Sequence, residues 1–78
     1  MVIKILGSGC ANCVKLEETA RRAVADLGID ATVEKVTDLN DIISYGVMTT
    51  PALVVDEQVK VAGRVPSSEE VKRILQSS

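Results

Sequence analysis

The sequence predicts an α/β fold in which a four-stranded mixed sheet is flanked by three helices, in the order β-α-β-α-β-β-α. Short apolar runs bounded by turn residues alternate with segments of helical periodicity, which is typical of this class. The first two apolar runs are separated by a long helical segment, so we expect them to pair as parallel strands through a helical crossover. A length of 78 residues allows one domain.

The first half of the chain predicts a strand, a helix and a second strand. The apolar run 2–6 is followed by Gly7-Ser8-Gly9, which indicates a strand that enters a turn. Apolar residues then recur at helical spacing up to Gly28, which is a suitable residue to end a helix. The alternating segment 31–36 predicts the second strand. The expected apolar helix face comprises Cys13, Leu16, Ala20, Ala23, Val24 and Leu27.

The next segment predicts a short helix and a hairpin. Asp38 is a good N-cap for a helix that runs to about Tyr45, and Gly46 is suited to end it. The apolar runs 52–55 and 59–62 are separated by a polar turn, which predicts two antiparallel strands.

The C-terminal segment predicts a final helix. Ser67 precedes it, and Glu70 three residues later completes the pattern of a capping box. We expect its apolar face to consist of Val71, Ile74 and Leu75.

Composition excludes several classes of function. Hydrophobic residues make up 46% of the chain and Tyr45 is the only aromatic residue, so the core must be aliphatic. The net charge is −2 without a basic stripe, and a single aromatic residue does not form a stacking platform, so we expect no nucleic-acid binding. Lys4 interrupts the short N-terminal apolar run, which is too short for a signal peptide or a membrane span. We therefore expect a soluble cytoplasmic protein that does not bind membranes. We take it to be a monomer by default, since the sequence carries no signal for its oligomeric state.

Two cysteines form the motif that carries chemistry, Cys10-Ala11-Asn12-Cys13. Cys10 falls at the predicted helix N-terminus, where unpaired N–H groups and the helix dipole stabilise a thiolate. Reactive cysteines in such positions have pKa values below the free value of about 8.5. Cys13 falls on the apolar face, where burial keeps a thiol protonated. This placement predicts dithiol–disulfide chemistry, with Cys10 as the attacking thiol and Cys13 as the resolving thiol.

Three other interpretations compete with redox chemistry. A static disulfide is not expected in the cytoplasm, and Cys10 lies among turn residues rather than in a packed run, which disfavours an inert core cysteine. The main alternative is a soft-metal module of the ferredoxin-like metallochaperone kind, because two thiolates suit Cu(I). That family has the order β-α-β-β-α-β and usually a Met where Ser8 stands, whereas this chain is expected to end in a helix. No metal site is therefore predicted.

The chain resembles the thioredoxin/glutaredoxin superfamily, and in particular the very small thioredoxin-like redox-active disulfide proteins of archaea and bacteria. The likeness covers the whole chain and depends on the CxxC motif, on Thr49-Thr50-Pro51 before the third strand and on Gly63 after the fourth. It implies that residues 1–78 form one minimal thioredoxin-like domain. It also implies a dithiol–disulfide oxidoreductase that needs no cofactor, acts on protein disulfides and is recycled by a separate reductase.

The resemblance also assigns further site residues. It implies a cis peptide bond before Pro51, which then faces the cysteine pair, and a substrate-binding role for Thr50, Pro51 and Gly63. Thioredoxins usually have Trp where Gly9 stands and Gly-Pro where Ala11 and Asn12 stand. We take Gly9, Ala11 and Asn12 as residues that support the site.

Lys4 stands where thioredoxins carry a buried carboxylate, and it has two interpretations. Its stem packs over the sheet while its ammonium is solvated, or it points toward Cys13 and favours thiolate there.

Overall fold

The computed structural model describes residues 1–7 and 11–77. Its strands form one sheet in the order β2-β1-β3-β4. The strands are β1 Val2–Leu6, β2 Thr32–Val36, β3 Ala52–Val55 and β4 Gln58–Ala62. Strand β2 pairs with β1 in parallel, whereas β3 is antiparallel to both β1 and β4. The mixed four-stranded sheet, the parallel first pair and the hairpin are therefore confirmed.

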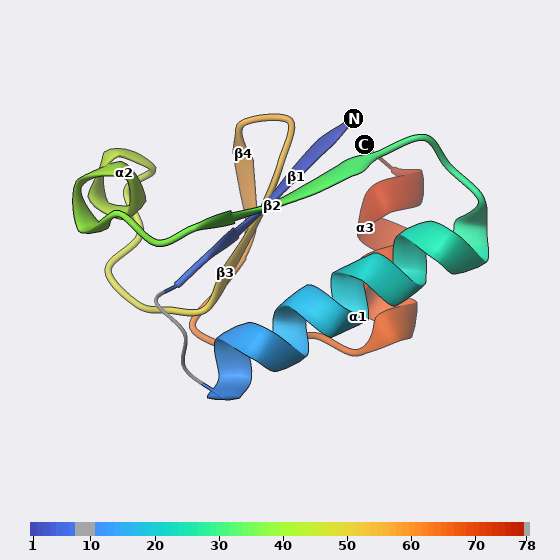
Figure 1. Cartoon of the computed structure of the whole chain (residues 1–78), viewed down its shortest axis with the longest axis horizontal. Coiled ribbons are helices and arrows are strands. Elements are labelled where there is room, and N and C mark those ends of the chain that lie inside the picture. The colour runs from blue at the N-terminus through green and yellow to red at the C-terminus, as the bar shows by residue number, and fades with distance from the viewer. Residues whose placement is uncertain (8–10, 78) are drawn as a thin grey trace.

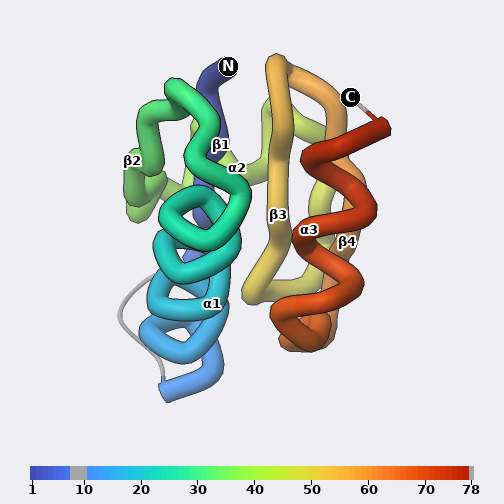
Figure 2. The backbone as a smooth tube through the Cα atoms, turned by 90° about the vertical axis from the view of Figure 1, so that its right-hand side faces the viewer, coloured from blue at the N-terminus to red at the C-terminus, as the bar shows by residue number. Residues whose placement is uncertain are grey.

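In the described part of the chain, three helices cover the two faces of this sheet. They are α1 Ala11–Leu27, α2 Leu39–Ser44 and α3 Ser68–Gln76, and the element order is the predicted one. Helices α1 and α3 lie side by side on one face, and α2 lies at the opposite side of the sheet (Figures 1 and 2). Within residues 1–7 and 11–77, no helix is long and apolar enough to cross a membrane.

The larger core fills the space between the sheet and helices α1 and α3. Ile3 and Ile5 of β1 point into it, as do Leu53 and Val55 of β3. The helices contribute the predicted apolar faces, and Ala20 and Ala23 allow α1 to pack closely on the sheet. The buried helix residues of this core are Leu16, Ala20, Ala23, Val71 and Leu75.

The smaller core lies on the other face, under α2. Leu6 of β1 and Val54 of β3 point toward this side and contact Ile42 of α2 and the following Val47. Because β3 is buried on both faces, its residues Ala52–Val55 are all apolar. The sheet therefore joins two separate aliphatic cores.

The predicted N-caps of α2 and α3 are present, but the predicted capping box of α3 is incomplete. The Asp38 side chain accepts a hydrogen bond from the Asn40 N–H at 2.8 Å, and Ser67 accepts one from the Glu70 N–H at 3.2 Å. The capping box at α3 is only half formed, because both Glu70 carboxylate oxygens accept hydrogen bonds from Arg64. A guanidinium offers two parallel charged donors, which form stronger hydrogen bonds than one backbone N–H.

The turn between β3 and β4 is fixed to β1. Asp56 and Glu57 both have positive φ, 49° and 68°, as in the mirror-image turns that suit two-residue hairpins. The Asp56 N–H donates to the Val2 carbonyl at 2.9 Å, and the Val2 N–H donates to the Asp56 carboxylate at 2.9 Å. These two bonds stabilise a turn that non-glycine residues rarely adopt.

Leu16→Ala should lower the free energy of unfolding by about 2–5 kcal/mol, because it leaves a cavity in the larger core. Leu39→Ala is the matched control, since Leu39 is 68% exposed and its truncation should change stability by less than about 0.5 kcal/mol. Urea unfolding of both variants measures the difference. Equal losses would contradict this description of the core.

Candidate active site

Cys13 lies in the first turn of α1 and faces the interior. Its side chain is 5% exposed, so the predicted burial is confirmed, and its sulfur is disulfide-bonded. Ala11 and Asn12, the first two residues of α1, are exposed. Cys10 and Gly9 lie outside the described residues, so their predicted roles stay predictions.

Gly7 brings the end of β1 against the Cys13 sulfur. A methyl group placed on Gly7 would lie 2.3 Å from Cys13 Sγ and 3.7 Å from Thr50 Cβ. The Gly7 N–H also donates to the Val36 carbonyl at 3.0 Å, which holds this backbone in the sheet. Only a residue without a side chain fits here. The Cys13 sulfur and the Thr50 side chain both lie close to the position that a Gly7 side chain would occupy.

The segment before β3 supplies the residues that the resemblance assigns to substrate binding. The Thr50–Pro51 peptide bond is cis, as predicted. The Pro51 carbonyl accepts a hydrogen bond from the Gly63 N–H at 2.9 Å, and a methyl group on Gly63 would lie 2.9 Å from Thr49 Oγ1. The structure therefore brings Gly63 against the segment Thr49-Thr50-Pro51, and Thr50 and Cys13 lie on either side of Gly7. That Pro51 faces both cysteines stays a prediction, since Cys10 is outside the described residues.

An apolar hollow adjoins Thr50 on the side of α2. Three of its large apolar side chains are exposed, Leu39 by 68%, Ile43 by 53% and Met48 by 90%. Large apolar side chains that gather at one surface often mark an interaction site. The residues that line the hollow are Thr37, Leu39, Ile42, Ile43, Val47, Met48 and Thr50.

Lys4 does not point toward Cys13, so that interpretation is wrong. Side chains alternate along β1: Ile3 and Ile5 face α1, whereas Lys4 pairs with Val54, which faces α2. Lys4 is not simply solvated either, because its side chain is 22% exposed and its ammonium has two partners. The sequence could not show which face of β1 the cysteine helix would cover.

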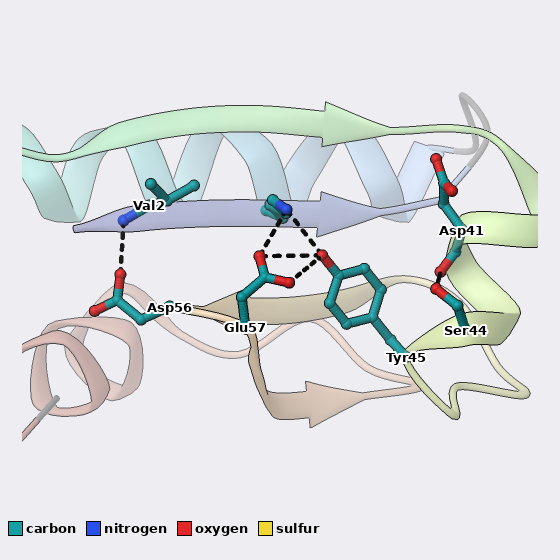
Figure 3. Close-up of polar contacts among 7 residues, drawn as sticks. Val2, Asp41, Ser44, Tyr45, Asp56 and Glu57 are labelled. Carbon is teal, nitrogen blue, oxygen red and sulfur yellow. Dashed lines mark hydrogen bonds and ion pairs between the residues drawn. The ribbon is translucent and has the colours of Figure 1, made fainter.

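Lys4 instead joins a polar cluster with Tyr45 and Glu57, which the sequence did not reveal. Figure 3 shows Tyr45 and Glu57 of this cluster. Lys4 Nζ donates to Glu57 Oε1 at 2.7 Å and to Tyr45 Oη at 2.8 Å, and Tyr45 Oη donates to Glu57 Oε2 at 3.0 Å. The Lys4 ammonium also lies 5.6 Å from the Tyr45 ring centroid. Bonding to Glu57, then to Tyr45, raises the pKa of Lys4, and the Lys4 ammonium holds the pKa of Glu57 below its usual range.

The metal-binding alternative gains no support. The elements follow the order β-α-β-α-β-β-α, which differs from the β-α-β-β-α-β order of the metallochaperones considered above because α2 lies between β2 and β3. Among the residues that the structure describes, no group of three or more His, Cys, Asp or Glu side chains could hold a metal ion.

A disulfide-bonded cysteine in the first turn of a helix, next to a cis-proline segment on a mixed sheet, is the arrangement of a thioredoxin-like thiol–disulfide oxidoreductase. Comparison with known families agrees, because the family model described as "Thioredoxin domain" matches residues 1–76. The chain belongs to this family.

Two curated relatives support the same assignment. The chain is 51% identical to a thioredoxin of Methanothermobacter thermautotrophicus, over 96% of this chain and 97% of that protein. It is 43% identical to a thioredoxin of Methanocaldococcus jannaschii, over 99% of this chain and 88% of that protein. Both likenesses extend over nearly the whole chain, which supports a thioredoxin-like redox function for this protein.

Gly7→Ala should lower the free energy of unfolding by about 1–3 kcal/mol in the reduced protein, because the added methyl overlaps Cys13 Sγ. The same substitution in a Cys13→Ala background should cost at least about 1 kcal/mol less, since the sulfur is gone. Urea unfolding of the four proteins of this double-mutant cycle gives the coupling. An equal cost in both backgrounds would show that Gly7 and Cys13 do not constrain each other.

Proposed function

We propose that this protein exchanges a Cys10–Cys13 dithiol/disulfide with protein disulfides. The observation that carries the proposal is the disulfide-bonded, buried Cys13 beside Thr50. The sequence contains one other cysteine, Cys10, three residues earlier. Residues at this spacing next to a helix start can form a disulfide, and the CxxC motif is typical of such exchange.

The two cysteines are assigned different roles. Cys10 directly precedes α1, whose first turn contains no acidic residue to compete for the helix N–H groups. The helix dipole therefore favours a Cys10 thiolate and lowers its pKa. Cys13 is buried, and burial disfavours the charged form of a thiol. Cys10 is thus the attacking thiol, and Cys13 is held in reserve as the resolving thiol.

The proposed reaction has two exchange steps. The Cys10 thiolate attacks one sulfur of a substrate disulfide, so that an S–S bond forms with Cys10 as the substrate S–S bond breaks and releases one thiolate. Cys13 then loses its proton and attacks the Cys10 sulfur, which forms the Cys10–Cys13 bond and releases the second substrate thiolate. Two electrons and two protons pass from the dithiol to the substrate. A separate reductase must return them.

The residues around Thr50 support a protein, rather than a small molecule, as the disulfide substrate. Thr50 lies near Cys13, and Gly63 is bonded to the adjacent Pro51, so the backbone of these residues can accept an extended peptide, with Gly9, Ala11 and Asn12 at the cysteine side. The apolar hollow beside Thr50 can cover an apolar side chain of that peptide. This activity suits a reducing compartment such as the cytoplasm.

Cys13→Ser should react with a protein disulfide such as that of insulin and stop as a mixed disulfide at Cys10, because no resolving thiol remains. Cys10→Ser should lose turnover altogether, because the buried Cys13 cannot replace an exposed thiolate. Intact mass spectrometry detects the trapped species, and a reductant-coupled turnover assay measures the loss. Val14→Ser is the matched control, since it changes an exposed residue of the same helix and keeps both cysteines.

Two outcomes would contradict these roles. If Cys10→Ser keeps most of the turnover, the order of the two cysteines is reversed. If neither cysteine variant differs from Val14→Ser, the protein does not act through disulfide exchange.

A further inference from the structure

The segment that carries Thr50 begins at Tyr45, which is held by the Lys4–Tyr45–Glu57 cluster. Tyr45 directly follows α2 and caps its C-terminus with an N–H···O bond to Ile42 at 3.2 Å. Residues 46–50 then lead to the cis-proline bond beside Cys13. The position of Tyr45 therefore sets where this segment starts.

Helix α2 has few other attachments to the sheet. It has six residues, and Ile42 is its only buried residue. Val47 adds one buried side chain after the helix, whereas Leu39, Ile43 and Met48 are exposed. The hydrogen bonds of the Tyr45 hydroxyl therefore provide one of the main attachments of α2 to the sheet.

The partners of Tyr45 are themselves held rigidly. Lys4 lies in β1, which has a neighbouring strand on each side. Glu57 lies in the β3–β4 turn, and the adjacent Asp56 is bonded twice to Val2. Figure 3 shows Glu57 and Tyr45 reaching toward each other from the turn and from the end of α2. The cluster therefore connects α2 to the two central strands.

We propose that Lys4, Tyr45 and Glu57 are positioning residues, which act on protein substrates by ordering residues 46–50. The inference rests on the proposed function. The three side chains bond to one another on the α2 side of the sheet, whereas Cys13 lies in α1, so we expect the cluster to leave the chemistry of exchange unchanged. It keeps the Thr50 backbone in the conformation that an extended peptide pairs with, and a pre-ordered segment loses less entropy when it binds.

The test compares Tyr45→Phe with the wild-type protein on two substrates. Tyr45→Phe removes the bonds of the hydroxyl to Lys4 and Glu57, while it keeps the ring in the smaller core and the Lys4–Glu57 ion pair. We expect the KM for insulin to rise about two- to tenfold, the factor that loss of a hydrogen bond gives, with kcat unchanged. The rate with a small aromatic disulfide, which does not need the segment, should change less than about twofold.

The matched control is Asp26→Asn, which breaks the Asp26–Lys72 ion pair between α1 and α3 and should leave both substrates unaffected. Amide hydrogen exchange gives a second readout that does not depend on activity. We expect faster exchange over residues 46–50 in Tyr45→Phe, and no change there in Asp26→Asn.

The outcomes separate this inference from the proposed function. Failure of the wild-type protein to reduce either disulfide would refute the exchange activity, and the catalytic part of the inference with it, whereas hydrogen exchange would still report whether the cluster orders the segment. An unchanged KM for insulin, or equal losses on insulin and the small disulfide, would overturn the positioning role.

Discussion

Burial of the two central strands on both faces is the constraint on which the rest of this structure depends. A chain of 78 residues with one aromatic residue has to gain its stability from aliphatic packing. In strands β1 and β3, Ile5 and Leu53 pack toward α1 and α3. Leu6 and Val54 pack toward α2 on the other face. One pair of strands therefore supports two cores, and each core fixes one side of the site.

The proposed active site lies where these two sides meet, at the C-terminal end of β1. The larger core holds α1 and so places Cys13, whereas the smaller core and the polar cluster hold α2 and so place the segment that leads to Thr50. Gly7 lets the two approach, because it has no side chain to separate the sulfur from Thr50. The proposed disulfide exchange thus takes place where the cores on opposite faces of the sheet come closest.

Much of this could be predicted from the sequence, because local signals were strong. The cap at Asp38 and the apolar run of β3 indicated elements that the structure contains, and the burial of Cys13 followed from helical spacing. The cis bond before Pro51 required the family resemblance, since cis is the minority form of X–Pro bonds. The partners of Lys4 could not be predicted, because Glu57 is 53 residues away and strand alternation does not tell which face a helix will cover.

The central claim is that Cys10, at the start of α1, is the thiolate that attacks. A pH titration of thiolate absorbance in Cys13→Ser tests it most directly, because Cys10 is then the only thiol in the chain. The account predicts a midpoint below the free-cysteine value of about 8.5. A midpoint at or above that value would contradict it, because the helix would then give Cys10 no advantage as a nucleophile.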